Sequence, residues 1–264
     1  MRVPGVHYRL ILFLLGGAGL GALLIWAVTG LPEFGDYSGS YGLILNEVVA
    51  SERHVANLVS AVNYDYRALD TLGEEFILLT AVTGVVLLLR LAREERGERI
   101  PAPWEVDDLL RATGPTLVAL TLLFGLYIVA HGQLTPGGGF QGGVIIATGV
   151  LLLFLVGGYS AFRRIALRSG VEALEAIGTG GYIVVGLFGL ILGGSFLENF
   201  LPLGEFRALL SGGTVPLISL LVGCAVAGGF TSIYLEFLEI AVETRMTEPR
   251  SEDDGRRPTE GGER

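Results

Sequence analysis

The stretch H-G-Q-L-T-P-G-G-G-F-Q-G-G, His131–Gly143, decides how this sequence folds, because it separates two long apolar runs. Five glycines and one proline fall within residues 136–143 of it. So much backbone freedom between apolar segments indicates that another part of the structure approaches the backbone closely. The stretch therefore predicts a tight packing turn between two membrane helices, with Phe140 as its apolar anchor.

The composition agrees with a membrane protein that crosses the bilayer several times. Of the 264 residues, 51% are hydrophobic and 17% are charged, and the mean hydropathy is +0.59. A soluble domain of this size would not cover so much apolar surface. Because about 20 apolar residues cross a hydrocarbon layer, the sequence predicts an all-α fold with six spans. These are Leu10–Leu31, Leu72–Leu91, Ala112–Ala130, Gly142–Phe162, Ala176–Leu197 and Gly213–Leu235.

The arginines predict the orientation of these spans. All 18 basic residues are arginines, and only Arg53, Arg67 and Arg207 lie in segments that follow the first, third or fifth span. Arginine excess marks the cytoplasmic side. We therefore expect a protein of the plasma membrane with both termini in the cytoplasm. The glycine-rich turn then faces outward. The first run is longer than the core of a signal peptide and lacks a cleavage site, so it is interpreted as a retained span.

Composition along the chain predicts three parts. Residues 1–100 would form a two-span domain, residues 101–244 a four-span domain, and residues 245–264 a charged tail that is expected to be disordered. In the first part, Leu43–Val62 has apolar residues at helical spacing, which predicts one amphipathic helix. That helix would lie on the bilayer or on a partner subunit, or it would pack on its own loops.

Several classes of function are excluded by what the sequence lacks. It has no basic cluster of the kind that binds nucleic acid. Its single cysteine, Cys224, excludes a disulfide framework and a thiolate metal site. We find no catalytic constellation, no metal-ligand cluster and no cofactor fingerprint. The sequence therefore predicts a protein that moves ions or supports a complex, with no catalytic residues, no metal and no cofactor of its own.

The second span contains acids because its apolar core is short. Phe76–Leu89 would span about 21 Å at ~1.5 Å per residue, so a full crossing draws in Glu74 and Glu75, with Asp70 one turn further out. A carboxylate at mid-membrane costs about 2.5–3.5 kcal/mol, which indicates a use such as a proton or cation relay. Alternatively both acids sit at the interface, where a helix N-terminus favours them. Glu74 is the preferred candidate for an ion path.

Other polar residues allow two interpretations each. His131, at the end of the third span, would pass protons or simply cap backbone carbonyls. The glycine-rich turn lacks the lysine of a phosphate-binding loop, and a cation filter built from its carbonyls would need repeats or several subunits. Near the C-terminus, Glu236, Glu239 and Glu243 recur at spacings of three and four, which predicts a solvated acidic face.

The turn also carries a family resemblance. L-T-P-G-G-G-F-Q-G-G-V, residues 134–144, after a span that ends in His-Gly, resembles the signature of the B subunit (MnhB-like) of Mrp-type multisubunit Na⁺/H⁺ antiporters. Related subunits occur in energy-converting membrane-bound hydrogenases. The resemblance covers roughly Arg111–Glu239, and this chain has Gln133 where members often have a second histidine. It implies that the following residues form a packing or interface motif: Thr135, Pro136, Gly137, Gly138, Gly139, Phe140, Gln141, Gly142 and Gly143.

A second resemblance lies in the first half. N-L-V-S-A-V-N-Y-D-Y-R-A-L-D-T-L-G-E, residues 57–74, resembles the C-terminal part of the large A subunit of those antiporters and the E-type subunit of the related hydrogenases. The shared pattern is D-[FY]-R, here Asp65-Tyr66-Arg67, followed by D-T-L-G-E, here Asp70 to Glu74. The chain thus resembles two neighbouring subunits joined through the segment Arg90–Arg111.

Together the resemblances imply an accessory membrane subunit of a Na⁺/H⁺ antiporter complex. Its expected partners are large antiporter-like subunits, a small C-type subunit, the lipid bilayer, and the ions Na⁺ and H⁺, with no nucleic acid. The resemblance implies that Glu74 lies on the ion path, with Asp70 and Arg67 setting its orientation and charge. Glu75 and His131 are further candidates from their positions in the sequence alone. The alternatives are a subunit of a redox-driven complex such as a membrane-bound hydrogenase, and a purely structural scaffold.

Overall fold

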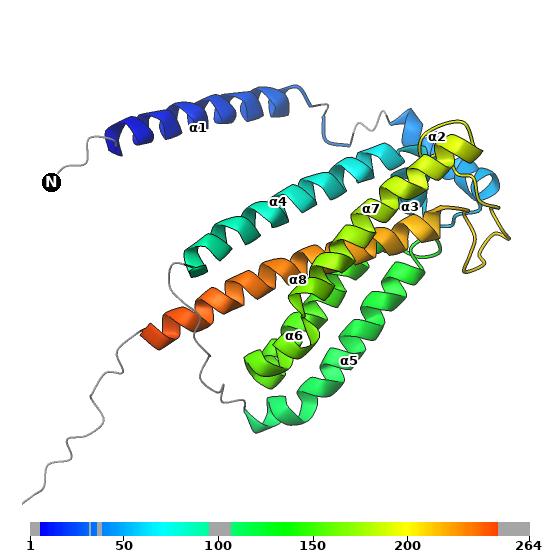
Figure 1. Ribbon diagram of the computed structural model, residues 1–264. Helices are drawn as coiled ribbons and strands as arrows, with labels where there is room; N and C mark the ends of the chain where they lie inside the picture. The colour runs from blue at the N-terminus through cyan, green and yellow to red at the C-terminus, as the bar shows by residue number, and fades with distance from the viewer. Residues whose placement is uncertain (1–5, 32, 36–38, 95–106, 248–264) are drawn as a thin grey trace, which may run out of the picture. The chain divides into compact units, whose positions relative to one another are not determined.

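The computed structural model describes residues 6–31, 33–35, 39–94 and 107–247, and in these ranges all regular structure is helical (Figure 1). The predicted all-α fold is confirmed. The helices in chain order are α1 (Val6–Thr29), α2 (Ser40–Glu52), α3 (Leu58–Ala61), the π-helix η1 (Val62–Tyr66), α4 (Ala68–Glu94), α5 (Asp108–Ala130), α6 (Gly139–Ile165), α7 (Arg168–Leu192) and α8 (Val215–Thr247).

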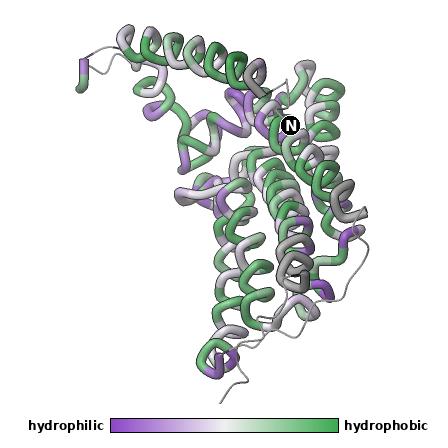
Figure 2. Tube along the Cα trace, turned by 90° about the vertical axis from the view of Figure 1, so that its left-hand side faces the viewer, coloured by the Kyte–Doolittle hydropathy of each residue, from purple (hydrophilic) through white to green (hydrophobic). Residues whose placement is uncertain are grey.

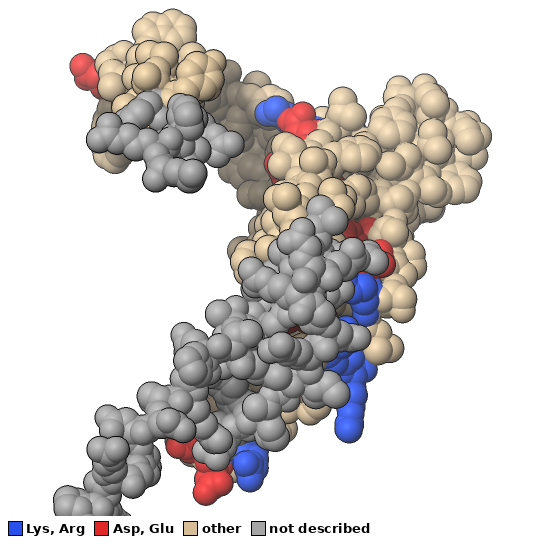
Figure 3. Space-filling view, turned by 60° about the vertical axis from the view of Figure 1, so that its left-hand side comes forward, with Lys and Arg blue, Asp and Glu red and all other residues tan. Residues whose placement is uncertain are grey.

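Six of these helices are long and apolar enough to cross a membrane, and they correspond to the six predicted runs: α1, α4, α5, α6, α7 and α8. Hydrophobic residues follow the long helices, whereas hydrophilic ones collect mainly near helix ends and in the connections (Figure 2). Most of the described surface in Figure 3 carries no charge. The protein is therefore a multi-pass membrane protein, and the side that its termini face stays a prediction.

Contacts divide the chain into residues 1–44 and residues 45–264. The first unit consists of α1 and the start of α2. Almost every described side chain of α1 is exposed, including Phe13 and Trp26. A helix that is apolar on all sides cannot remain in water, so α1 requires lipid or another subunit around it.

In the second unit, α8 is the central helix. It contacts α4, α5, α6 and α7, and 61% of its most apolar window is buried, a larger share than in any other span found. Its residues Ile218, Val222 and Val226 recur at intervals of four and so share one face. They join Tyr64 and Tyr182 in the main core cluster.

Small residues let the backbones of α5 and α6 approach closely. A Cβ atom added to Gly142 would lie 2.7 Å from the Gly125 carbonyl oxygen and 2.8 Å from the Val129 nitrogen. Such contacts are typical of helices in membranes, where close packing drives association. Gly142 is thus a position at which α6 packs directly against the backbone of α5.

The boundaries differ from the sequence predictions at several helix ends, and α7 is shifted to Arg168–Leu192 from the predicted Ala176–Leu197. Leu43–Val62 is not one amphipathic helix, because α2 ends at Glu52 and His54 has a φ of 53°, a left-handed conformation that breaks a helix. Val49 and Val55 are buried in the core of the second unit, so this segment packs on its own protein. In addition, α4 begins before the predicted Leu72, and α8 continues to Thr247 instead of stopping at Leu235.

The predicted division at residue 100 and most of the predicted tail lie outside the described residues, which omit 95–106 and 248–264. The three-part organisation therefore stays a prediction.

Candidate functional site

The glycine-rich stretch is a turn over residues 131–138 followed directly by α6, which begins at Gly139. The turn lies at the same end of the second unit as the start of α4 and the start of α8 (Figure 1); we call this the loop end. Gly137 and Gly138 have φ values of 145° and 147°. Side chains with a Cβ rarely adopt such values, so the turn requires glycine at both positions.

Asn57 holds the turn in place. Its amide nitrogen donates to the carbonyl oxygens of Gly132 at 2.7 Å and Thr135 at 2.9 Å. Its amide oxygen accepts from the Val59 backbone nitrogen at 3.1 Å and so caps α3. Asparagine suits this position because one side chain offers both donors and an acceptor. One residue therefore ties the first half of the chain to the turn.

Two further side chains of the first half reach the same turn. The Ser60 hydroxyl donates to the Gly132 carbonyl at 2.6 Å, and the Tyr64 hydroxyl accepts from the Gly139 backbone nitrogen at 3.1 Å. Burial raises the pKa of Tyr64 to about 12, so its hydroxyl stays neutral at ordinary pH. In addition, the backbone nitrogens of Ala56 and Asn57 donate to the Gln133 carbonyl.

These bonds decide between the interpretations of the turn. The carbonyls of Gly132 and Thr135 already accept hydrogen bonds from protein side chains, which favours a packing turn over a carbonyl filter for cations. Phe140 is 39% exposed in the chain by itself, and its anchoring role stays a prediction. Within the chain, the polar contacts of Asn57, Ser60 and Tyr64 hold the turn.

A cavity of ≈ 210 Å³ lies between the turn and the start of α4. Glu74 lines it from α4, Tyr64 from η1, and Gly137, Phe140 and Gln141 from the turn and the first turn of α6. The structure therefore brings the preferred acid and the glycine-rich motif to one place. We call this cavity the outer pocket.

Glu74 and Glu75 point to different surroundings. Glu74 is exposed at the outer pocket, whereas Glu75 is 1% exposed within the second unit. Adjacent helical residues differ by roughly 100° in direction, so only one of the two can face the outer pocket. Glu74 is the residue that faces it.

Arg67 and Asp70 pair with each other at 2.5 Å, and both side chains are more than half exposed. Asp65 of the D-Y-R pattern is buried between two partners from elsewhere. It accepts from the Asn199 amide at 2.7 Å and lies 3.3 Å from the Arg53 side-chain nitrogen Nε. Asp65 of the D-Y-R pattern therefore belongs to a polar cluster with Arg53 and Asn199 at the loop end.

His131 caps α5, as one of its two interpretations predicted. Its ring nitrogen Nδ1 lies 3.1 Å from the Tyr127 carbonyl oxygen, and its ring stacks on the Tyr127 ring at 4.2 Å between centroids. His131 does not line the outer pocket. A role for it in proton transfer stays an untested prediction.

The predicted solvated face of Glu236 and Glu239 is wrong. Their side chains are 1% and 7% exposed. Arg168 lies 2.5 Å from Glu236, and Arg163 lies 3.0 Å from Glu239. The α6–α7 connection brings these arginines to α8, so the acids form buried ion pairs; the side chain of Glu243 lies outside the described residues. We call this end of the second unit the arginine end.

Sequence reasoning missed several site residues, which are Asn57, Ser60 and Tyr64 at the turn and the acid Glu175. Asn57 has no local signal beyond a cap in front of a short helix, since its partners are at residues 132–137. Glu175 was missed although it is an acid directly before the predicted fifth span; it is 8% exposed. Within the part of the chain that the structure describes, no group of three or more His, Cys, Asp or Glu side chains could hold a metal ion.

Comparisons with known proteins show which proteins this chain is similar to. Residues 109–232 match a domain described as related to the MnhB subunit of Na⁺/H⁺ antiporters. An uncharacterized protein of Methanocaldococcus jannaschii is 31% identical over 210 residues, which cover 71% of this chain and 79% of that protein.

Two solved structures contain similar chains. One is a chain of the membrane-bound sulfane sulfur reductase, an archaeal respiratory membrane complex, with 34% identity and a TM-score of 0.67, covering 88% of this chain and 98% of that chain. The other is a chain of the Mrp complex from Dietzia sp., with 28% identity and a TM-score of 0.62, covering 89% of this chain. This protein spans only 26% of the length of that second chain.

Proposed function

Because this chain belongs to the family related to the MnhB subunit of Na⁺/H⁺ antiporters, we propose that it works as a membrane subunit of a multisubunit cation/proton antiporter and that its outer pocket belongs to the ion path. Its partners are the large antiporter-like subunits and a small C-type subunit. The similarity to a chain of the Mrp complex supports this assembly. The chain itself is a transporter subunit and catalyses no chemical conversion.

The position of Glu74 is the observation that carries the proposal. This carboxylate is exposed on a helix that has the length and hydropathy of a membrane span, and it lines the outer pocket beside the glycine-rich turn. A carboxylate against lipid is costly. The exposure of Glu74 in the isolated chain is therefore best explained by a partner subunit, with the pocket between them open to ions.

The exposed apolar helices support work inside a complex. Several large side chains of α5 are exposed, including Leu123, Phe124 and Leu126. Lipid alone can cover them, but a subunit with one buried central helix and exposed outer helices also offers surfaces to neighbours. The same holds for α1, whose surroundings must come from outside its own unit.

We also propose that the chain joins the equivalents of two subunits. Residues 1–100 would correspond to the end of the large A subunit, and residues 101–244 to the B subunit. The similarity to the Mrp complex supports this, since 89% of this chain matches a continuous chain there within 26% of its length. The bonds from Asn57 and Tyr64 to the turn would then reproduce a contact between subunits.

Replacing Glu74 by Gln in the assembled complex tests the proposal. Cation-dependent proton movement in membrane vesicles should fall at least about tenfold, because a positioned proton-transfer group contributes that much or more. The partners should still co-purify. Glu205→Gln removes the same charge from an exposed loop residue and should leave transport unchanged. Full transport by Glu74→Gln would remove Glu74 from the ion path.

One observation favours a second candidate, a subunit of a redox-driven respiratory complex. The chain of the sulfane sulfur reductase complex is matched over 98% of its length. Gentle purification with identification of the co-purifying chains separates the candidates. Iron–sulfur or other redox subunits among them would support the second candidate, whereas antiporter-like subunits alone would support the first.

A further inference from the structure

Glu75 is a buried acid for which the outer pocket gives no role. It is 1% exposed, and neither of its carboxylate oxygens has a hydrogen-bond partner among the described residues. Glu175 of α7 is 8% exposed, and its oxygen Oε1 likewise has none there. Two acids that are so deeply buried and so poorly satisfied in one bundle require an explanation.

The register of α4 and α7 brings these two acids to the same level. The Tyr182 hydroxyl of α7 donates to the Ala68 carbonyl of α4 at 2.8 Å. From that bond toward the arginine end, Glu75 follows Ala68 by seven residues along α4, and Glu175 precedes Tyr182 by seven along antiparallel α7. Seven residues make about two helical turns, so both acids return to the faces that the bond joins.

α8 leaves room for Glu175 at this level. A Cβ atom added to Gly229 would lie 3.1 Å from Val82 Cγ2 of α4 and 3.4 Å from Glu175 Oε1 of α7. Side chains of α4 and α7 therefore meet over Gly229. Val82 follows Glu75 by another seven residues, which places Glu175 beside the stretch between these two positions of α4.

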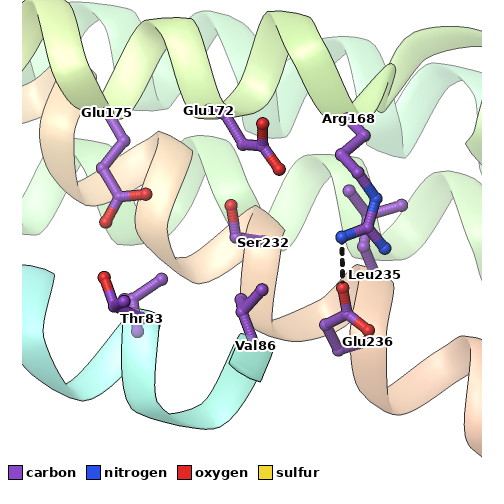
Figure 4. A pocket seen from close by; sticks show the side chains of 9 residues that line it. Thr83, Val86, Arg168, Glu172, Glu175, Ser232, Leu235 and Glu236 are labelled. Atoms are coloured by element: carbon purple, nitrogen blue, oxygen red, sulfur yellow. Dashed lines mark ion pairs between the residues drawn. The ribbon is translucent and has the colours of Figure 1, made fainter. Parts of the chain in front are cut away.

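Glu175 also opens into a second cavity, of ≈ 200 Å³, which extends to the arginine end and which we call the inner cavity. Figure 4 shows the Glu175 side chain pointing from α7 toward Thr83 of α4. The volume is enough for several waters, and polar groups are present to bind them. The polar residues that line the inner cavity are Thr83, Arg168, Glu172, Glu175, Ser232 and Glu236.

The two cavities lie on opposite sides of the acid pair. Glu74, next to Glu75, lines the outer pocket at the loop end, and Arg168 and Glu236 form an ion pair at the far end of the inner cavity (Figure 4). The outer pocket thus reaches Glu74, the chain neighbour of Glu75, and the inner cavity reaches Glu175, so the two buried acids lie between the two cavities.

A buried carboxylate without partners does not remain charged, because removing an unpaired ion from water costs far more than binding a proton. Two such groups at the same level can hold one proton between them, since like charges at close range cannot both ionise. A bound proton is therefore the simplest occupant of the pair.

We propose that Glu75 and Glu175 form a proton relay inside this chain, between the outer pocket at Glu74 and the inner cavity at Arg168. Glu74 takes a proton from water at the outer pocket and passes it to the neighbouring Glu75, which becomes neutral while Glu74 returns to its carboxylate form. The proton then passes to the Glu175 carboxylate, directly or through a cavity water, which leaves Glu75 ionised and Glu175 neutral. Glu175 releases it to water of the inner cavity. The relay rests on the proposed transport function.

Titratable groups from each neighbouring element face the pair. Glu75 interacts electrostatically with Glu74 on its own helix and with Glu175 on α7. It also interacts with Tyr64 of η1 and Tyr182 of α7. Glu175 has Glu172 as its charged neighbour on α7. α8 contributes Glu236, which is paired with Arg168.

Infrared difference spectroscopy of the purified complex tests the relay without transport. A pH step on the wild-type complex should change the carbonyl stretching band of protonated carboxylic acids. Glu175→Gln and Glu75→Gln should each remove part of that band, and Glu205→Gln should not. Unchanged bands in both relay variants would overturn the proposal. It would also be overturned if both variants lost ²²Na⁺ binding while their infrared bands stayed as in the wild type.

Transport measurements separate this inference from the proposed function. If the wild-type complex exchanges cations for protons, Glu175→Gln should slow exchange at least about tenfold, with partners still attached, and Glu175→Asp should retain part of the rate with a shifted pH profile. Full exchange with an unchanged profile in Glu175→Gln would overturn the relay alone. A wild-type complex without any exchange would refute the proposed function, whereas the infrared bands would still decide whether the pair binds protons.

Discussion

The Tyr64 hydroxyl accepts a hydrogen bond from the Gly139 backbone nitrogen at 3.1 Å, and this bond joins the π-helix of the first half to the first turn of α6. The first backbone nitrogens of a helix have no partner inside the helix. In α6 the partner comes from a residue 75 positions earlier. The glycine-rich motif is therefore completed by the half of the chain that does not contain it.

Replacing Tyr64 by Phe should destabilise the protein, because the Gly139 nitrogen loses its buried acceptor. We expect a loss of about 1–2 kcal/mol in the free energy of unfolding, measured by denaturation in mixed micelles. Tyr66→Phe is the matched control, since the Tyr66 hydroxyl bonds Glu52 at an exposed position. Equal losses in the two variants would show that the bond to Gly139 has no special weight.

Replacing Asn57 by Ala should have a larger effect than any other single loss at the turn. The Thr135 carbonyl would lose its side-chain donor, and the Gly132 carbonyl would keep only the Ser60 hydroxyl; a buried group left unsatisfied costs about 1–3 kcal/mol. Limited proteolysis should then cut the turn around residues 132–138. Asn46→Ala, at an exposed position of α2, should leave the digestion pattern unchanged. Wild-type resistance of Asn57→Ala would contradict the anchoring role.

Replacing Gly142 by Ala should separate α5 from α6. The new Cβ would lie against Val129 Cγ2 and 2.7 Å from the Gly125 carbonyl oxygen, closer than real contacts allow, and two of its three nearest atoms are backbone atoms. Steric overpacking of this kind costs about 1–3 kcal/mol or more. Gly180→Ala provides the control, because nothing lies within 4 Å of its added Cβ. The yield of folded protein in detergent should fall for Gly142→Ala and not for Gly180→Ala.

The six spans could be predicted from sequence because a membrane leaves the backbone almost no choice. Every polar backbone group must be satisfied within the segment, so a long apolar run becomes a helix. For the same reason the sequence of such a helix does not show which of its sides faces the rest of the protein. α4 is apolar on most sides, so nothing local showed that Glu75 would face α7 and α8 while Glu74 faces outward.

The polar contacts could not be predicted because their partners are far apart in sequence. Asn57 acts on residues 132–137, and Glu75 and Glu175 come to the same level only through the register of two antiparallel helices. The acids of α8 looked solvated since their spacing places them on one face, and only the fold brings Arg163 and Arg168 against that face. The turn motif was found because its signal is local: a positive φ at Gly137 and Gly138 needs glycine itself.

The ion pairs at the arginine end provide the last prediction. Arg168 contacts Glu236 at 2.5 Å and Glu239 at 3.4 Å, and these acids are 1% and 7% exposed. Replacing Arg168 by Met would leave buried carboxylates without this counterion, which costs about 3–5 kcal/mol.

Denaturation in mixed micelles should therefore show a large loss of stability for Arg168→Met, and Glu236→Gln added to it should restore part of that loss. Arg67→Met offers the contrast, because the Arg67–Asp70 pair is more than half exposed on both sides and such pairs contribute at most about 1 kcal/mol. Similar losses for Arg168→Met and Arg67→Met would mean that water screens the arginine end as well as it screens the surface. In that case the inner cavity would be open to bulk solvent at its Arg168 end.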